Sequence, residues 1–371
     1  MNLHRRFDLT PVINAAGTFT PLGVSRSSPA VREASAQALG EFLLIEELQQ
    51  RAGAAIAAWS GAEAGAVVHC VAGAITMAVA AAIAGEDAAS IARLPDPGGQ
   101  ARRVVLPAGH AIDYGHPIVQ DIRLAGGVAV LAGDDDACSI AELERALGDD
   151  DVACLLLVSS RLVRGAALDF PAAVAAAHRR GAPAFVDGAA QDMRLPELLA
   201  TGADLVFASG QKYLAAPTVG LVAGSTAWVR ALRAQERGIG RAMKPSKEAI
   251  VGLLVAIDER RALDAASWAR EQAGKVAGFI ERCTGLAGVS ARARPDPSGI
   301  AFERVHLRIE PAIAGTDATR LAAMLADGAP SIKVMTHGLA KDEIILELVP
   351  LAPAEVDAII LRLAELLDPA R

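Results

Sequence analysis

The sequence predicts an α/β fold with a mostly parallel seven-stranded sheet flanked by helices, followed by a small C-terminal α+β domain. Between residues 60 and 225, short apolar runs alternate with helical patterns, and such runs are typical of strands covered on both faces. Beyond about residue 255 the pattern changes, and 303–310 alternates strictly between apolar and polar residues, as in a half-buried strand. The length of 371 residues, 52% of them hydrophobic, is sufficient for two cores.

The elements of the large domain follow from this alternation. The predicted strands are rich in Val, Leu and Ala, and cover 66–70, 103–106, 128–131, 152–158, 184–187, 205–208 and 220–223. The predicted helices show apolar spacing of three and four residues, and cover 74–84, 117–125, 140–147, 171–180 and 195–200. Ligands of such folds bind beyond the carboxyl ends of the strands.

The predicted small domain begins with a long helix over 255–283. Strands at 303–310, 332–335 and 343–348, with helices at 316–326 and 353–367, complete an antiparallel α+β unit, and the clearest loop is 292–299. We therefore expect three regions: an N-terminal arm and helix over 1–50 that contributes to the active site or small domain, a large domain over 51–255, and the small domain over 256–371.

Composition narrows the function classes. The net charge of -7 and an aromatic content of 4% argue against nucleic acid as a partner. Four scattered cysteines indicate a reduced, cytoplasmic protein, and the N-terminus lacks the apolar run of a signal peptide. The most apolar segment, 71–85, is too short to span a bilayer, so we predict a buried helix and no membrane partner. No spacing of ligands predicts a metal.

A lysine and an aspartate at strand ends carry the main functional hypothesis. Lys212 follows a short apolar strand through a turn of small residues, and Asp187 ends the preceding strand. Taken alone, Lys212 is a solvated loop lysine and Asp187 the cap of a helix. Together they fit pyridoxal 5'-phosphate, because the lysine can form a Schiff base while the carboxylate keeps the pyridine nitrogen protonated.

Two segments could hold the cofactor phosphate. Ser209 lies three residues before Lys212, within the same turn. Val71, Ala72 and Gly73 join a strand to a helix, and small residues there expose backbone N–H groups at a helix N-terminus. Neither GxGxxG nor a P-loop occurs, so dinucleotides and nucleoside triphosphates lack their usual binding loop.

Three side chains between residues 110 and 116 are candidates for contact with the cofactor ring. His110, Tyr114 and His116 precede the helix at 117–125. One of them could stack on the ring or protonate a leaving group, and the sequence does not choose among them. The alternative is a turn that only caps the helix.

A basic segment and an N-terminal segment are candidates for substrate binding. Arg241, Lys244 and Lys247 place three cations on a Gly-rich stretch, which suits an anionic substrate group, whereas the alternative is a solvated basic surface. Thr18 and Thr20 lie in an uncharged Gly/Thr-rich stretch that is either a flap over the site or an ordered surface arm.

Seven short motifs in order resemble the selenocysteine synthase-like group of fold-type I pyridoxal-phosphate enzymes, and within it the D-glucosaminate-6-phosphate ammonia-lyase branch. They extend from residue 13 to about 255, and the Ser-Gly-x-Lys and Arg-x-Met-Lys-x-x-Lys-Glu segments are the most specific. The motifs are Ile13-Asn14-Ala15-Ala16-Gly17-Thr18, Gly61-Ala62-Glu63-Ala64, Asp113-Tyr114-Gly115-His116, Val186-Asp187-Gly188-Ala189, Gly202-Ala203-Asp204-Leu205, Ser209-Gly210-Gln211-Lys212-Tyr213 and Gly240-Arg241-Ala242-Met243-Lys244-Pro245-Ser246-Lys247-Glu248.

The resemblance implies that Lys212 forms the internal Schiff base, that Asp187 binds the pyridine nitrogen, and that Ser209 and the turn at 71–73 hold the phosphate. It also implies a homodimer or a higher even-numbered oligomer. The expected activity is that of a lyase which removes an α-proton and a β-substituent from a small anionic amino acid or amino-sugar acid, giving a 2-keto acid and ammonia. Transamination, racemisation, aldol cleavage and a tRNA-directed transferase remain alternatives on the same scaffold.

Overall fold

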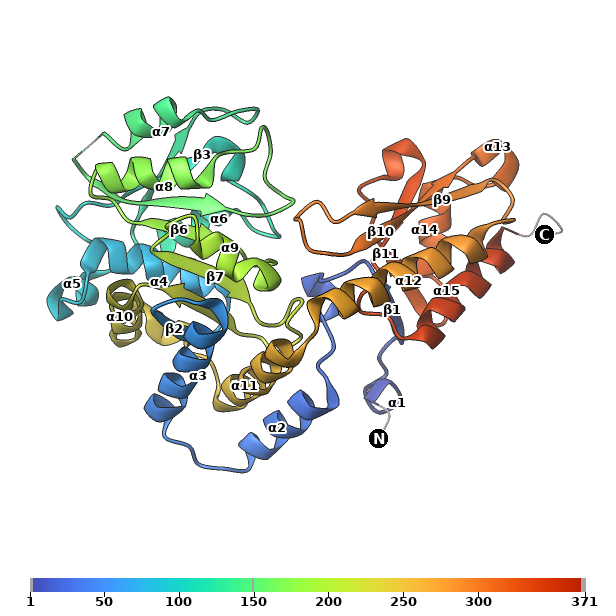
Figure 1. Cartoon of the computed structure of the whole chain (residues 1–371), viewed down its shortest axis with the longest axis horizontal. Helices are drawn as coiled ribbons and strands as arrows, with labels where there is room; N and C mark the ends of the chain where they lie inside the picture. The colour runs from blue at the N-terminus through green and yellow to red at the C-terminus, as the bar shows by residue number, and fades with distance from the viewer. Residues whose placement is uncertain (1–2, 149, 368–371) are drawn as a thin grey trace. The chain divides into compact units, whose positions relative to one another are not determined.

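The structure, a computed structural model that describes residues 3–148 and 150–367, divides into two compact units (Figure 1). The larger unit is Ser27–Ala262, and the smaller combines Met1–Arg26 with Leu263–Arg371. These limits differ from the predicted ones at 50 and 255. The segment after residue 26 joins the larger unit because its helices α2 (Pro29–Leu39) and α3 (Ile45–Ser60) pack on α11 (Lys247–Ala262).

The larger unit is built on the predicted seven-stranded sheet, with strand order β2-β8-β7-β6-β5-β3-β4. β8 runs antiparallel to both of its neighbours, and the remaining pairs are parallel. The strands are β2 (Ala64–Val68), β3 (Arg103–Pro107), β4 (Val128–Ala132), β5 (Val152–Val158), β6 (Ala184–Asp187), β7 (Leu205–Ser209) and β8 (Gly220–Gly224). All seven predicted strands are therefore confirmed, with ends displaced by at most two residues.

Alternate strand residues enter separate cores on the two faces of the sheet. Val186 and Val206 lie in the core formed with α3, α7, α8, α9 and α11, whereas Phe185 and Phe207 lie in the core formed with α4, α5, α6 and α10. The helices other than α2, α3 and α11 are α4 (Val71–Ala84), α5 (Ala88–Arg93), α6 (Ile118–Leu124), α7 (Ile140–Ala146), α8 (Phe170–Arg179), α9 (Leu195–Leu199) and α10 (Thr226–Ala234).

Helix α4 is the buried helix predicted for the most apolar segment. Nearly all of its residues are buried, because it packs under the sheet and against α6 and α10. Across residues 3–148 and 150–367, no helix combines the length and apolarity needed to traverse a bilayer.

The smaller unit contains a three-stranded antiparallel sheet, β12-β10-β9, and a separate parallel pair, β1-β11. One apolar core joins these strands to α12, α14 and α15. The elements are α1 (Leu3–Phe7), β1 (Val12–Ala15), α12 (Ala265–Cys283), β9 (Val289–Pro295), β10 (Glu303–Ile309), α13 (Pro311–Ala314), α14 (Ala318–Ala326), β11 (Ser331–Val334), β12 (Glu343–Leu346) and α15 (Pro353–Leu366).

Three predictions for this region need correction. The single helix expected at 255–283 is two helices, because Asp264 accepts hydrogen bonds from the backbone of Ala266 and Ser267 and so begins α12. The loop expected at 292–299 starts only at Asp296, since residues up to Pro295 pair with β10. The strand near 332–335 pairs with β1 instead of joining the antiparallel sheet.

Candidate active site

Asp187 and Lys212 emerge from neighbouring strands at the same edge of the sheet. Asp187 ends β6, which pairs in parallel with β7, and Lys212 lies in the turn that follows β7. The backbone N–H of Gly188 donates to the carbonyl of Phe207 at 2.9 Å, and that of Ser209 donates to Ala189 at 2.9 Å. The two segments are thus joined directly, as the hypothesis requires.

Asp187 is a buried carboxylate with a perturbed acidity. It is 5% exposed, and its Oδ1 accepts a hydrogen bond from the backbone of Ala189 at 2.9 Å. Burial raises the pKa of Asp187 to about 6, while the opposite charge of Lys212 and the Ala189 hydrogen bond act against this rise. A cationic ring nitrogen would supply the compensating partner that a buried carboxylate needs.

Lys212 is held in a turn with several internal backbone hydrogen bonds. Its N–H donates to Ser209 at 3.3 Å, and its carbonyl accepts from Ala215 at 3.0 Å. Burial lowers the pKa of the Lys212 amine; Asp187 opposes this shift, and the cation Arg161 adds to it. Since only the neutral amine is a nucleophile or a base, this environment favours both roles. Arg161 was not identified from the sequence.

The predicted phosphate turn begins α4. Cys70 is the N-cap, and its Sγ accepts a weak 3.4 Å hydrogen bond from the N–H of Gly73. Gly220 on β8 lies between this turn and Ser209: it pairs with Ser209, and a Cβ added to it would lie 2.6 Å from the backbone carbon of Cys70. Ser209 and the N-terminus of α4 therefore lie at one edge, where an anion is favoured by backbone N–H groups and the helix dipole.

The predicted basic segment contacts the same turn. The N–H of His69 donates to the carbonyl of Met243 at 2.8 Å, and a Cβ on Gly73 would lie 3.3 Å from that of Met243. Arg241 and Lys244 flank Met243, so the structure brings them to the β2–α4 turn. Both are candidates for an anionic group there.

Lys247 is engaged elsewhere. Its Nζ donates to the backbone carbonyls of Leu39 and Glu41, in the connection between α2 and α3. This contact ties the start of α11 to that connection, which is a structural role that the sequence did not predict.

Tyr114 and His116 form a cluster with Asp121 of α6. The Tyr114 hydroxyl donates to Asp121 Oδ2 and lies 2.8 Å from His116 Nε2, which is 3.1 Å from Asp121 Oδ1. Burial and the carboxylates of Asp121 and Asp187 raise the pKa of Tyr114, so the phenol stays protonated. This electrostatic contact with Asp187 places the cluster beside the candidate cofactor site. Asp121, 2% exposed, was missed by sequence reasoning.

His110 has different surroundings from the other two aromatic candidates. It is 4% exposed, its Nδ1 accepts a hydrogen bond from the N–H of Val158 at 2.9 Å, and its ring lies 5.8 Å from that of Phe170. Burial lowers its pKa to about 4, so the ring is neutral at pH 7. These contacts favour Tyr114 and His116 over His110 for a role at the cofactor.

The segment containing Thr18 and Thr20 belongs to the smaller unit. Asn14 closes it with two local hydrogen bonds, to Ala16 and Gly17, and the backbone of Glu347 donates to Ala15. It is therefore an ordered arm, and contact of its threonines with substrate remains a prediction.

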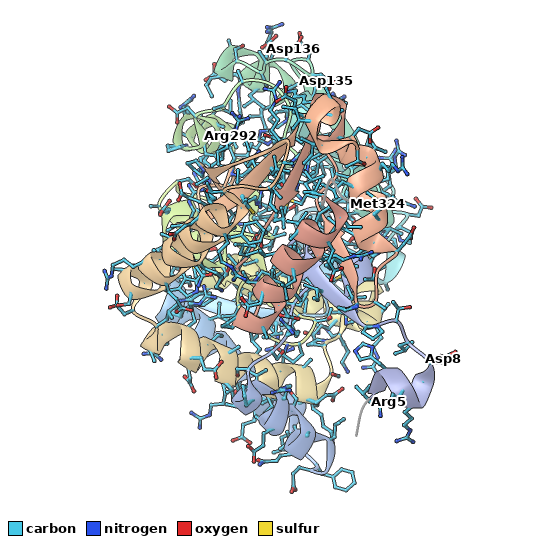
Figure 2. The ribbon with its side chains drawn as sticks, turned by 90° about the vertical axis from the view of Figure 1, so that its right-hand side faces the viewer. Arg5, Asp8, Asp135, Asp136, Arg292 and Met324 are labelled. Carbon is cyan, nitrogen blue, oxygen red and sulfur yellow. The ribbon has the colours of Figure 1, made fainter. Side chains whose placement is uncertain are left out.

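An acidic loop at the same edge lies away from Lys212. Figure 2 shows the side chains of Asp135 and Asp136 on the loop after β4, and β4 is separated from β7 by three strands in the sheet order. Asp135 pairs with Arg164 at 2.7 Å. In the parts of the chain that are described, no group of three or more His, Cys, Asp or Glu side chains is arranged to hold a metal ion.

The residues present fit pyridoxal phosphate. Beyond the buried carboxylate of Asp187, the loop that follows it contains Gln191, which is fully buried. Neither polar atom of the Gln191 side chain has a hydrogen-bond partner among the described residues. Such unused capacity is costly, but a side chain with no exposed surface does not face the site, so the fit rests on the buried Asp187 carboxylate and the Lys212 amine. Gln191 was not selected from the sequence.

Comparison with known proteins agrees with this geometry. The aminotransferase class-V family model matches residues 123–251. D-glucosaminate-6-phosphate ammonia lyase of Salmonella typhimurium is 33% identical over 100% of this chain and 99% of its own length. A 5'-C-glycyluridine monooxygenase-decarboxylase of a Streptomyces species is 36% identical over 98% of this chain and 92% of its own length.

The same relationship holds in three dimensions. A solved structure of D-glucosaminate-6-phosphate ammonia-lyase superposes with a TM-score of 0.89 at 34% identity, covering 99% of this chain and 98% of that chain. Fold and site together define a pyridoxal-phosphate-dependent enzyme of fold type I.

The chain belongs to the D-glucosaminate-6-phosphate ammonia-lyase family of these enzymes. It is a pyridoxal-phosphate-dependent lyase, as the resemblance implied.

Proposed function

We propose that Lys212 binds pyridoxal phosphate covalently, with Asp187 at the pyridine nitrogen and with Ser209 and the backbone at Val71–Gly73 at the phosphate. The observation that carries this proposal is the meeting of the buried Asp187 carboxylate and the Lys212 amine at adjacent strand ends, each with a pKa shifted by burial.

When bound, the cofactor would supply an electrophilic aldehyde carbon for a substrate amine and a cationic ring that withdraws electrons from the α-carbon. The side chains then have separate tasks. Lys212 removes the α-proton as a general base, for which its lowered pKa suits it. Asp187 keeps its negative charge opposite the ring nitrogen. His116, which contacts Asp121 and the Tyr114 hydroxyl, donates a proton to the departing β-hydroxyl, while Tyr114 stays protonated and holds this cluster together.

We propose a substrate with an amino acid function, a sugar-derived chain and an anionic group. The names of both relatives describe compounds with an amino acid function and a sugar-derived portion. Arg241 and Lys244 at the β2–α4 turn, and Arg161 in electrostatic contact with Lys212, offer cations for a carboxylate or a phosphate. The favoured candidate is D-glucosaminate 6-phosphate.

The cofactor assignment is tested by the visible absorbance band of purified holoenzyme. The Lys212→Ala variant should lose this band or retain only loosely held cofactor, because it lacks the amine proposed to form the imine. Lys341→Ala, a change on the smaller unit, is the control and should be as yellow as the wild type. An unchanged band in Lys212→Ala refutes the assignment.

The substrate class is tested by ammonia and 2-keto acid release from a panel of D-glucosaminate, its 6-phosphate, and small D- and L-amino acids. We expect release from the phosphorylated sugar acid without an added keto acid. Arg241→Gln should raise KM for it roughly 10- to 100-fold through loss of a charged hydrogen bond, whereas Arg237→Gln, an exposed neighbour, should not. A requirement for a keto-acid acceptor would instead indicate an aminotransferase.

The Streptomyces relative favours a second candidate function, an oxygen-dependent decarboxylation of a glycyl nucleoside, because it is 36% identical over 98% of this chain. Both activities begin with a substrate amine at the same cofactor. Oxygen uptake with a glycyl nucleoside, and none with D-glucosaminate 6-phosphate, would select this alternative. Ammonia release from the sugar acid without oxygen uptake would reject it.

We further propose that the protein is a cytoplasmic homo-oligomer with an even number of subunits. All four cysteines are free, which suits a reducing compartment. The connection between α2 and α3 exposes a continuous apolar run that includes Phe42 at 104% and Leu44 at 75% of their reference areas. Apolar side chains this exposed are typical of a surface that another subunit covers.

A further inference from the structure

Arg260, in the last turn of α11, connects the two segments that carry Asp187 and Lys212. Its Nη1 lies 2.5 Å from Oδ2 of Asp192, which follows Asp187 by five residues, and its Nη2 donates to the carbonyl of Tyr213, the residue after Lys212. One guanidinium thus bridges the loop after β6 and the turn after β7.

This bridge is largely buried. The side chain of Arg260 is 12% exposed, and that of Asp192 is 1% exposed. Burial raises the pKa of Asp192 to about 6, and the charge of Arg260 opposes that rise. A buried ion pair seldom adds net stability compared with apolar residues, but it can define one arrangement. Arginine suits the task because its planar fork can serve two acceptors at fixed angles, which an ammonium cannot.

We infer that Arg260 is a positioning residue for Lys212: by holding Tyr213 and Asp192 together, it keeps the lysine turn closed against the Asp187 loop. This inference rests on the proposed attachment of the cofactor to Lys212. Backbone hydrogen bonds within this turn join Lys212 to Ser209 and Ala215, and Arg260 adds a hydrogen bond from α11 to the turn. The position of the amine determines its burial, and burial is the largest cause of its lowered pKa, ahead of the charges of Asp187 and Arg161.

The test is the pH dependence of the rate at which added pyridoxal phosphate generates the visible band in apoenzyme, which reports the pKa of the attacking amine. Arg260→Lys keeps the charge near Asp192 but loses the fork. We expect the apparent pKa to rise by about one unit, a tenfold change in the protonation equilibrium, because the turn loosens and the amine gains water. Arg261→Lys, an exposed neighbour on the same helix, should titrate like the wild type.

A paired variant separates positioning from stability. Arg260→Met combined with Asp192→Leu leaves no buried unpaired charge, so it should fold with a melting temperature near that of the wild type. If Arg260 positions Lys212, the apparent pKa of the attacking amine remains raised in this variant although its melting temperature is restored. The inference is overturned if the apparent pKa in both Arg260→Lys and the paired variant equals that of the wild type.

Failure of the proposed cofactor attachment to Lys212 can be distinguished from failure of the inference about Arg260. If wild-type apoenzyme forms no band, or Lys212→Ala forms the same one, the cofactor assignment is wrong and the inference falls with it. If wild type and Lys212→Ala behave as proposed while the Arg260 variants titrate normally, only the inference is wrong.

Discussion

At the scale of single residues, the site depends on a carboxylate and an amine that burial drives toward their neutral forms. The pKa of Asp187 is raised and that of Lys212 is lowered, and each partly offsets the shift of the other. A neutral Lys212 can attack an aldehyde, and a cationic ring nitrogen restores the charge of Asp187. The apoenzyme is therefore suited to bind a cofactor that carries both an aldehyde and a cationic ring nitrogen.

This balance predicts a pH dependence of cofactor affinity. Because the pKa of Asp187 is about 6 and the bound ring requires the ionised form, affinity should fall as pH drops through about 6, by up to about tenfold per pH unit. Cofactor dissociation constants measured from pH 5 to pH 8 would show it. The Asp187→Asn variant should bind the cofactor more weakly at pH 8, and its affinity should no longer fall as the pH drops through about 6.

The comparison isolates Asp187 because Asp192, with a pKa also raised to about 6, is present in both proteins. Equal pH slopes in the wild type and Asp187→Asn would show that another group controls the low-pH loss of affinity.

The Tyr114 hydroxyl gives a second prediction at this scale. Tyr114→Phe keeps an aromatic face and removes the hydroxyl that donates to Asp121 and contacts His116. We expect the cofactor band to persist and kcat to fall by about tenfold, because the proposed general acid His116 loses a hydrogen-bond partner that orients it. Single-turnover measurements with the substrate identified by the panel would separate this loss from binding. A kcat near that of the wild type would mean that Tyr114 acts only through its ring.

At the scale of elements, β8 sets the approach of the phosphate turn to the lysine turn. Gly220 pairs with Ser209 on one side and with Val68 on the other, and it packs against the backbone of Cys70 at the start of α4. No side chain fits at position 220. Ser209 and the start of α4, which are proposed to bind the phosphate, can therefore lie close together on either side of Gly220.

Gly220→Ala should therefore lower stability and weaken cofactor binding together. Its Cβ would lie 2.6 Å from the backbone carbon of Cys70, so the turn must move, at a cost of about 1–3 kcal/mol. Chemical denaturation of apoenzyme and equilibrium binding of cofactor would measure both effects. Gly274→Ala on α12, where nothing lies within 4 Å of the new methyl group, is the control and should be neutral or slightly stabilising.

At the scale of the whole molecule, the larger unit contains the proposed cofactor site, and the arm with Thr18 and Thr20 belongs to the smaller unit. The apolar run between α2 and α3 also belongs to the larger unit. Lys247 holds that connection through Leu39 and Glu41, and it begins the helix that ends at Arg260. Helix α11 thus links the exposed apolar run to the bridge behind Lys212.

The proposed oligomer gives a prediction at this scale. Phe42→Asp places a charge in the exposed apolar run and should convert the oligomer into smaller species, as measured by light scattering after size-exclusion chromatography. Leu361→Asp, at an isolated exposed leucine of α15, is the control. An unchanged mass in Phe42→Asp would show that subunits associate through another surface, and a monomeric wild type would refute the oligomer.

The sequence by itself determined the α/β class, all seven strands of the large sheet and the strand-end positions of Asp187 and Lys212. These follow from local patterns, because runs of apolar residues and small-residue turns reflect burial and backbone geometry within a few residues. The break at Asp264 and the strand at Val289–Pro295 were missed, since a helix cap and an edge strand give weak local signals.

Only the tertiary structure decided which polar side chains surround the site. Asp121, Gln191, Arg161 and Arg260 were not selected, and Tyr114 and His116 could not be separated from His110, because their surroundings come from segments far apart in the chain. Lys247 belongs to a basic motif yet bonds to the α2–α3 connection. Burial and charge–charge interactions depend on distance in space, and no spacing along a single sequence encodes that distance.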